Sequence, residues 1–234
     1  MSQSSSRKKG GAPPSEDWLT RYWPTIREYT VSIGIALAIA FFLRFFFVQA
    51  FTIPSASMVP TLQIGDYLLV NKLLYGIRVP VSGTRYMSFF EPERGDIIVF
   101  VYPVDPNKDF IKRVIGVPGD VIEIRKKQLF RNGEIVDRED EPYAQYGSRP
   151  GERDNYGPET VPEGHVFVMG DNRDNSSDSR TWGFVPYENI IGKAFVIYFS
   201  WDRSEPTPFW VPWTYGWPRA ERVGLLESGG PVAR

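Results

Sequence analysis

Two serines lie close together in a short segment bounded by prolines, residues 53–62 (IPSASMVPTL). Ser55 and Ser57 flank a single alanine, and proline restricts the backbone on both sides of the pair. A rigid loop of this kind can present a hydroxyl together with backbone N–H groups. Acyl transfer needs such a nucleophile beside donors for the developing oxyanion. The local sequence fits a Ser/Pro linker equally well.

A lysine within an apolar strand pattern offers a base for that nucleophile. In the predicted strand 109–116 (DFIKRVIG), Lys112 shares a face with Phe110 and Val114, while Arg113 points the other way. A lysine must be neutral to accept a proton, and its ordinary pKa is about 10.4. Burial among apolar groups lowers that pKa by as much as roughly 3–5 pH units. The alternative is an ordinary, half-exposed strand lysine.

A third segment, residues 170–183 (GDNRDNSSDSRTWG), is rich in carboxylates, amides and hydroxyls. Counted from Asp174, the spacing suggests a calcium loop. Its sixth position is Ser179 instead of glycine, and its twelfth is Val185 instead of glutamate. We therefore reject the calcium loop, and a solvated loop remains the alternative to a functional segment.

The composition excludes several other chemistries. The 234 residues contain no cysteine and one histidine, which excludes thiol nucleophiles and cysteine-based zinc sites. That histidine, His165, begins the alternating segment 165–170, and we do not expect it to act as a base. Lys and Arg number 27 against 28 Asp and Glu, so the chain lacks the basic surface of a nucleic-acid-binding protein. We expect no metal, no cofactor and no nucleic-acid partner.

The elements that must position these residues are mainly strands. Short β-rich runs bounded by turn residues occupy residues 67–73, 96–102, 109–116, 121–125, 165–170 and 193–199. Asn132-Gly133 predicts a two-residue hairpin turn, because type I′ turns need positive φ at both positions. The polar, Pro/Gly-rich stretch 138–163 predicts a loop or part of a small cap. The pattern favours a mostly β fold, an antiparallel sheet or barrel-like domain with a small β cap at about 119–164.

An apolar segment precedes the β-rich region. Residues 29–50 are about long enough for a helix that crosses a hydrocarbon core, and Arg44 lies near one end, where it can extend to the headgroups. Five basic residues come before it: Arg7, Lys8, Lys9, Arg21 and Arg27. The positive-inside rule then places the N-terminus in the cytoplasm and the rest outside. A signal peptide cleaved after Ala50 and a buried core helix are the alternatives.

The three segments occur in a recognisable order behind the anchor. PSASMVPTL, then RGDIIVF leading to DFIKRVIGVPGD, then GDNRDNSSDSRTWGFVP resemble the motifs of bacterial type I signal (leader) peptidases, over about residues 45–200. The resemblance implies a β-rich, membrane-bound serine endopeptidase without a cofactor. Such an enzyme removes N-terminal signal peptides from exported preproteins after small-x-small motifs.

The resemblance also implies a role for individual residues, carried over by motif register. Ser57 is the nucleophile and Lys112 is the general base of a Ser/Lys dyad. The Ser55 hydroxyl and the Ser57 backbone N–H form the oxyanion hole, and Ser176 orients the Lys112 amine. Four residues support this arrangement structurally: Asp171, Asn172, Asp178 and Arg180.

These assignments divide the chain into a cytoplasmic tail (1–28), an anchor (29–50), a catalytic domain (51–202) and a C-terminal segment (203–234). The C-terminal segment carries five aromatic residues among prolines: Phe209, Trp210, Trp213, Tyr215 and Trp217. They either contact the membrane interface or pack as core.

The expected protein is single-pass in the cytoplasmic (inner) membrane, with its catalytic domain on the extracytoplasmic side. Its expected partners are signal peptides, the lipid bilayer and the secretion machinery. A Ser/Lys self-cleaving regulator is a second hypothesis, but residues 1–28 are too few for the DNA-binding domain it needs. A membrane-tethered binding module with inert Ser and Lys is a third.

Overall fold

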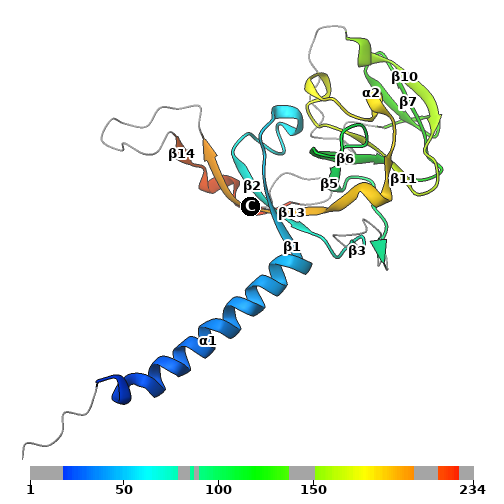
Figure 1. Ribbon diagram of the computed structural model, residues 1–234. Helices are drawn as coiled ribbons and strands as arrows, with labels where there is room; N and C mark the ends of the chain where they lie inside the picture. Colours follow the sequence, from blue (N-terminus) through cyan, green and yellow to red (C-terminus); the bar gives the residue numbers. More distant parts are fainter. Residues whose placement is uncertain (1–17, 79–84, 87–89, 137–150, 203–215, 227–234) are drawn as a thin grey trace, which may run out of the picture. The chain divides into compact units, whose positions relative to one another are not determined.

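The structure is a computed structural model that describes residues 18–78, 85–86, 90–136, 151–202 and 216–226 (Figure 1). The chain forms two compact units, Met1–Leu43 and Arg44–Arg234. Within the described residues, the first unit is helical and the second contains the strands.

Helix α1 runs from Trp18 to Phe46. Its segment Tyr22–Phe42 has a mean hydropathy of 1.4 and is long and apolar enough to cross a membrane. The side chains described in this segment are exposed, unlike those of a core helix.

The helix differs at both ends from the expected anchor at 29–50. It begins at Trp18, and its last residue is Phe46. Val48–Thr52 form strand β1, because their backbone pairs with β2 in a register that joins Val48 to Asn71 and Thr52 to Tyr67. The apolar sequence continues across this boundary, so hydropathy alone does not show where the helix ends.

The main sheet has nine strands and is antiparallel throughout. It contains β1 (Val48–Thr52), β2 (Asp66–Asn71), β5 (Ile97–Val101), β6 (Asp109–Gly116), β11 (His165–Met169), β12 (Val185–Pro186), β13 (Ile190–Asp202), β14 (Trp217–Pro218) and β15 (Gly224–Leu225). Its order is β1-β2-β13-β5-β6-β11-β12, and β14 and β15 also pair with β13. The predicted mostly β, antiparallel fold is confirmed, but the sheet does not close into a barrel.

A small sheet corresponds to the predicted cap. It contains β7 (Val121–Arg125), β8 (Gln128–Arg131), β9 (Glu134–Ile135) and β10 (Tyr156–Thr160), in the order β10-β7-β8-β9. The hairpin at Asn132-Gly133 has φ of 56° and 85° at the two residues, as a type I′ turn requires. Strand β10 lies within the stretch 138–163, so this part of the expected loop pairs with β7. Residues 137–150 lie outside the described chain.

The remaining elements are short. Strands β3 (Ile77–Arg78) and β4 (Arg85–Tyr86) pair with each other. Single helical turns are η1 (Ala56–Met58), η2 (Glu152–Asp154), η3 (Arg173–Asn175), α2 (Ser179–Trp182), η4 (Tyr187–Asn189) and η5 (Ala220–Arg222).

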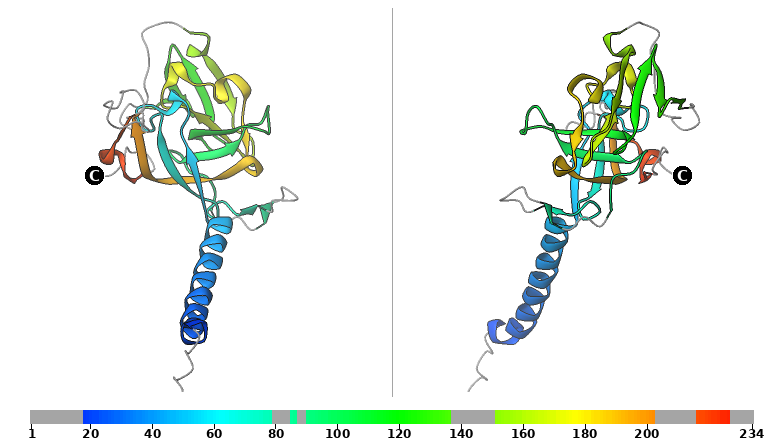
Figure 2. Two further views of the ribbon diagram at one scale, coloured as in Figure 1. Left: turned by 60° about the vertical axis from the view of Figure 1, so that its left-hand side comes forward. Right: turned by 90° about the vertical axis from the view of Figure 1, so that its right-hand side faces the viewer.

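Strand β5 explains how the core holds the site. Ile97 and Val99 pack into one hydrophobic cluster, and Ile98 and Phe100 pack into another on the opposite face of the sheet. This double burial accounts for the unbroken apolar run IIVFV. A third cluster, which includes Ile115, joins the small sheet to β6 and β11. Figures 1 and 2 show the strands of the small sheet beside the main sheet.

Candidate active site

The structure brings Ser57 and Lys112 together across 55 positions of sequence. Ser57 lies in the single helical turn η1, and Lys112 lies in β6, whose register pairs it with Ile98 of β5. Lys112 Nζ is 2.8 Å from Ser57 Oγ, within hydrogen-bond distance. Ser57 is 8% exposed and Lys112 is 4% exposed, so the pair is nearly shielded from water.

The surroundings of Lys112 suit a proton acceptor. Burial lowers the pKa of its amine to about 8, although the negative charges of Asp178 and Asp171 act in the opposite direction. Lys112 Nζ also donates to the Ile111 carbonyl at 2.9 Å and lies 5.3 Å from the centre of the Phe110 ring. The amine can therefore lose its proton at a mildly alkaline pH.

Ser55 lies at the entrance of the same turn. Its backbone is extended, with φ −131° and ψ 156°, and its side chain is exposed. Ser55 Oγ is 3.4 Å from Ser57 Oγ, longer than a usual bond between hydroxyls. The Ser55 hydroxyl is thus next to the Ser57 hydroxyl, and its role in an oxyanion hole remains a prediction.

The polar segment 170–183 lies against the serine turn. The Asn172 backbone N–H donates to the Ser57 carbonyl, and Asn172 Nδ2 donates to the Ala56 carbonyl, both at 3.1 Å. Gly170 allows this approach, because a Cβ there would lie 2.4 Å from the Ser57 carbonyl oxygen. The segment therefore fixes the backbone of the turn that carries Ser57.

Ser176 is buried in the same segment. Its hydroxyl makes no hydrogen bond to the Lys112 amine, which contacts Ser57 and Ile111. Its expected role in orienting the amine remains a prediction.

Asp178 and Arg180, two of the four residues expected to support the site, form an ion pair with each other. Arg180 donates to both carboxylate oxygens, at 2.8 and 2.9 Å, and both side chains are almost fully buried. Burial works against the charge of Asp178, but hydrogen bonding and the charge of Arg180 outweigh it, so the pKa of Asp178 is lowered. Asp178 also accepts the Gly170 backbone N–H, which links the ion pair to the serine turn.

Two residues that were not among the expected site residues, Arg113 and Thr61, hold Asp171. Arg113 donates to both Asp171 carboxylate oxygens, at 2.8 and 2.7 Å, and the Thr61 hydroxyl donates at 2.6 Å. The signal for Arg113 was its position in a strand buried on both faces, where an arginine needs an anionic partner. Thr61 gave no comparable signal.

Other sequence-derived candidates lie apart from this pair. His165 Nδ1 is 2.9 Å from the Glu163 carbonyl, a local contact at the start of β11. Of the five C-terminal aromatics, Trp217 is exposed in β14, and the other four lie outside the described residues. Within the described ranges, no group of three or more His, Asp or Glu side chains could hold a metal ion.

Comparison with known proteins finds relatives that match most of the chain. A crystal structure of a signal peptidase I from Enterococcus faecalis V583 aligns with 45% of this chain and 98% of that chain, at 33% identity and a TM-score of 0.38. Signal peptidase I of Pseudomonas aeruginosa is 43% identical over 236 residues, 87% of this chain and 80% of that protein. Signal peptidase I of Aquifex aeolicus is 37% identical over 237 residues, 78% of this chain and 88% of that protein.

A family model agrees with these relatives. The model described as "Signal peptidase, peptidase S26" matches residues 26–201, which include the serine turn, the Lys112 strand and the segment 170–183. The chain therefore belongs to the signal peptidase family, peptidase S26.

Proposed function

We propose that this protein is a membrane-anchored serine endopeptidase that removes N-terminal signal peptides from exported preproteins. The observation that carries the proposal is the buried pair of Ser57 and Lys112, whose reacting atoms lie 2.8 Å apart. Membership of the signal peptidase family supplies the substrate class.

The reaction follows from the atoms of this pair. Neutral Lys112 takes the proton of Ser57 as its Oγ attacks the carbonyl carbon of the scissile bond. The oxyanion that forms is held by the Ser55 hydroxyl and the Ser57 backbone N–H. Protonated Lys112 then gives its proton to the leaving amine. In the second half, a water molecule loses a proton to Lys112 and attacks the acyl carbonyl carbon. The bond between that carbon and Ser57 Oγ then breaks, and Lys112 returns the proton to Ser57.

Burial makes this use of a lysine feasible. A pKa of about 8 leaves roughly a tenth of the amines neutral at pH 7. A bound signal peptide would remove more water from the site and lower the pKa further. No carboxylate within the described residues accepts a hydrogen bond from the Lys112 amine, which would otherwise stabilise its charge.

Helix α1 supports the proposed anchoring. Its apolar segment Tyr22–Phe42 fits the thickness of a bilayer, and Arg27 and four further basic residues lie toward its N-terminal side. By the positive-inside rule the N-terminus is cytoplasmic, and residues after the helix are extracytoplasmic. Exported preproteins would reach the enzyme there, in association with the secretion machinery.

The proposed cleavage rule follows from strand geometry. A peptide bound in an extended form along a strand edge presents alternate side chains to the enzyme. The residues at −1 and −3 before the cut then face the site together, and the family resemblance implies that both are small. Replacing Ala by Phe at −1 of a test substrate should block cleavage, whereas −2 should accept large residues.

The test uses the full-length protein in detergent micelles with a purified preprotein. The wild type should release the mature protein, with the cut located by mass spectrometry, and Ser57→Ala should not. Cleavage by Ser57→Ala equal to that of the wild type would overturn the proposal. Absence of cleavage by the wild type would favour an inert binding module.

A further inference from the structure

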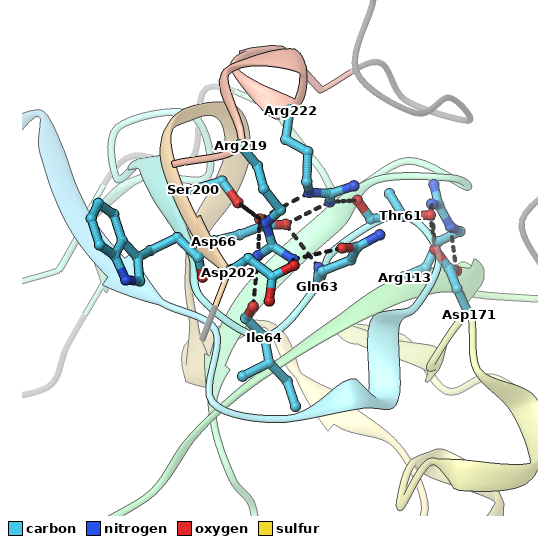
Figure 3. Close-up of polar contacts among 11 residues, drawn as sticks. Thr61, Gln63, Ile64, Asp66, Arg113, Asp171, Ser200, Asp202, Arg219 and Arg222 are labelled. Atoms are coloured by element: carbon cyan, nitrogen blue, oxygen red, sulfur yellow. Dashed lines mark hydrogen bonds and ion pairs between the residues drawn. The ribbon is translucent and has the colours of Figure 1, made fainter. Parts of the chain in front are cut away.

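A second buried carboxylate, Asp66, lies at the start of β2 and gathers polar groups from distant parts of the chain (Figure 3). Asp66 is fully buried. Its oxygens accept from Ser200 Oγ at 2.6 Å and from Arg222 Nε and Nη2 at 3.0 and 2.6 Å. The C-terminal turn η5 is thus tied to the beginning of β2.

Arg222 connects this cluster to the segment that carries the nucleophile. Besides Asp66, its Nη2 donates to the backbone carbonyl of Thr61 at 2.9 Å. One guanidinium group therefore holds both a buried carboxylate and a carbonyl four residues after Ser57.

Thr61 is held from its other side as well. Its hydroxyl donates to Asp171 at 2.6 Å and accepts from Arg113 Nη2 at 3.3 Å. Figure 3 shows Thr61 between the Arg222 and Asp66 pair and the Arg113 and Asp171 pair. Its side chain and its backbone are consequently fixed by different elements of the fold.

The segment between the two serines and Thr61 has little regular structure of its own. It contains the single turn η1, and the N–H of Leu62 donates to the Met58 carbonyl at 2.9 Å. A displacement of about 1 Å between reacting groups can cost about 100-fold in rate. The position of Ser57 Oγ relative to Lys112 therefore depends on what holds the two ends of the segment.

We propose that Thr61 and Arg222 are positioning residues for Ser57, so that the C-terminal turn η5 is part of the catalytic arrangement. This inference rests on the proposed peptidase function. Asn172 holds the Ser57 carbonyl, and Thr61 and Arg222 hold the segment four residues further on.

Thr61→Val tests the side-chain half of the proposal in the full-length protein. Valine has nearly the same shape but leaves the Asp171 oxygen without this donor. We expect kcat to fall about 10- to 100-fold, while KM stays within twofold of the wild-type value. In a plot of kcat/KM against pH, the midpoint of the acidic limb should not move. Thr61→Ser keeps the hydroxyl and should retain the wild-type kcat.

Arg222→Lys tests the backbone half, with Arg219→Lys as its matched control. Both arginines contact Asp66 and both are 14% exposed in their side chains. Arg219 reaches Gln63, Ile64, Ser200 and Trp201 but makes no hydrogen bond to Thr61. We expect Arg222→Lys to lower kcat at least tenfold and Arg219→Lys to have the kcat of the wild type. The melting temperature should fall by a similar amount in both variants.

The outcomes separate this proposal from the proposed function. If the wild type cleaves and Ser57→Ala does not, the peptidase function stands. A Thr61→Val variant with wild-type kcat would then overturn the positioning role. The positioning role would also be overturned if both arginine variants lost kcat equally and in proportion to their loss of melting temperature. A general structural role produces such equal losses.

Discussion

Lys112 and Arg113 are consecutive residues of β6, and they reach opposite halves of the site. Lys112 Nζ lies 2.8 Å from Ser57 Oγ, whereas Arg113 binds both carboxylate oxygens of Asp171. The alternation of side chains along a strand places them on opposite faces. One strand thus supplies the proposed base and, through Arg113, also fixes Asp171. The next residue, Asn172, donates to the Ser57 carbonyl.

Loss of either member of the dyad should abolish cleavage. We expect Ser57→Ala and Lys112→Ala each to lower kcat by about 10⁴-fold or more, and the double variant to be little worse than either, because the two side chains act as a unit. The measurement is preprotein cleavage by folded protein, with the melting temperature as control. Additive losses in the double variant would show that the residues act independently.

The pH dependence should report the Lys112 amine. Its pKa of about 8 means that the base is protonated and inactive at lower pH and neutral and active at higher pH. A plot of kcat/KM against pH should therefore rise through a midpoint near pH 8. A midpoint near the ordinary lysine value of about 10.4 would show that Lys112 is not the buried base.

The same pKa predicts an effect on stability. In the unfolded chain the lysine has its ordinary pKa of 10.5, and in the folded chain its pKa is about 8. Below pH 8 the buried charge destabilises the fold, and stability rises as the pH increases from 8 to 10.5. Lys112→Met should thus stabilise the protein by about 3 kcal/mol at pH 7, an order-of-magnitude figure from the shift.

Thermal unfolding at several pH values measures this effect. The advantage of Lys112→Met over the wild type should shrink between pH 8 and 10.5. The exposed Lys108 provides a control, since Lys108→Met should change stability little. A Lys112→Met protein less stable than the wild type at pH 7 would contradict the prediction.

Ser55→Ala should affect the transition state more than substrate binding. The Ser55 hydroxyl lies 3.4 Å from Ser57 Oγ, on the exposed side of the turn. Removing one oxyanion donor lowers kcat by about 10²–10³-fold with little change in KM. Steady-state kinetics distinguish this result from a change confined to KM, which would make Ser55 a substrate-binding residue.

Asp178→Asn should change both stability and the pH profile. It leaves Arg180 without its buried partner, and breaking such a pair costs about 3–5 kcal/mol. The Asp178 charge also raises the pKa of Lys112, so its removal should move the acidic limb of kcat/KM below pH 8. If the midpoint of this limb is unchanged in the folded variant, the charge of Asp178 does not raise the pKa of Lys112.

The local sequence predicts the strands well, because apolar alternation is a local property. Residues 109–116 and 121–125 form β6 and β7 with the predicted bounds. Strand β10 was less visible, since Tyr156–Thr160 is polar, contains a proline and pairs along one edge of β7. The end of α1 could not be predicted from hydropathy either, because β1 begins within the same apolar run.

The site was predictable only in part. Ser57, Lys112 and the Asp178–Arg180 pair belong to motifs with a fixed order. The contacts of Asp66 with Arg222 join residues 156 positions apart, and no periodicity or spacing links them. Such contacts form because a buried carboxylate must find cations, and the fold decides which cations are within reach.

Strand β13 has a consequence for the order in which the molecule can fold. It lies between β2 and β5 in the sheet, although it is made more than 85 residues after both. Until residues 190–202 have been synthesised, β2 and β5 have no common neighbour, and their facing edges remain open to incorrect pairing. Contacts of such high sequence separation form slowly. We therefore expect β13 to pair with β2 and β5 late in folding, after the segments that carry Ser57 and Lys112 have been synthesised.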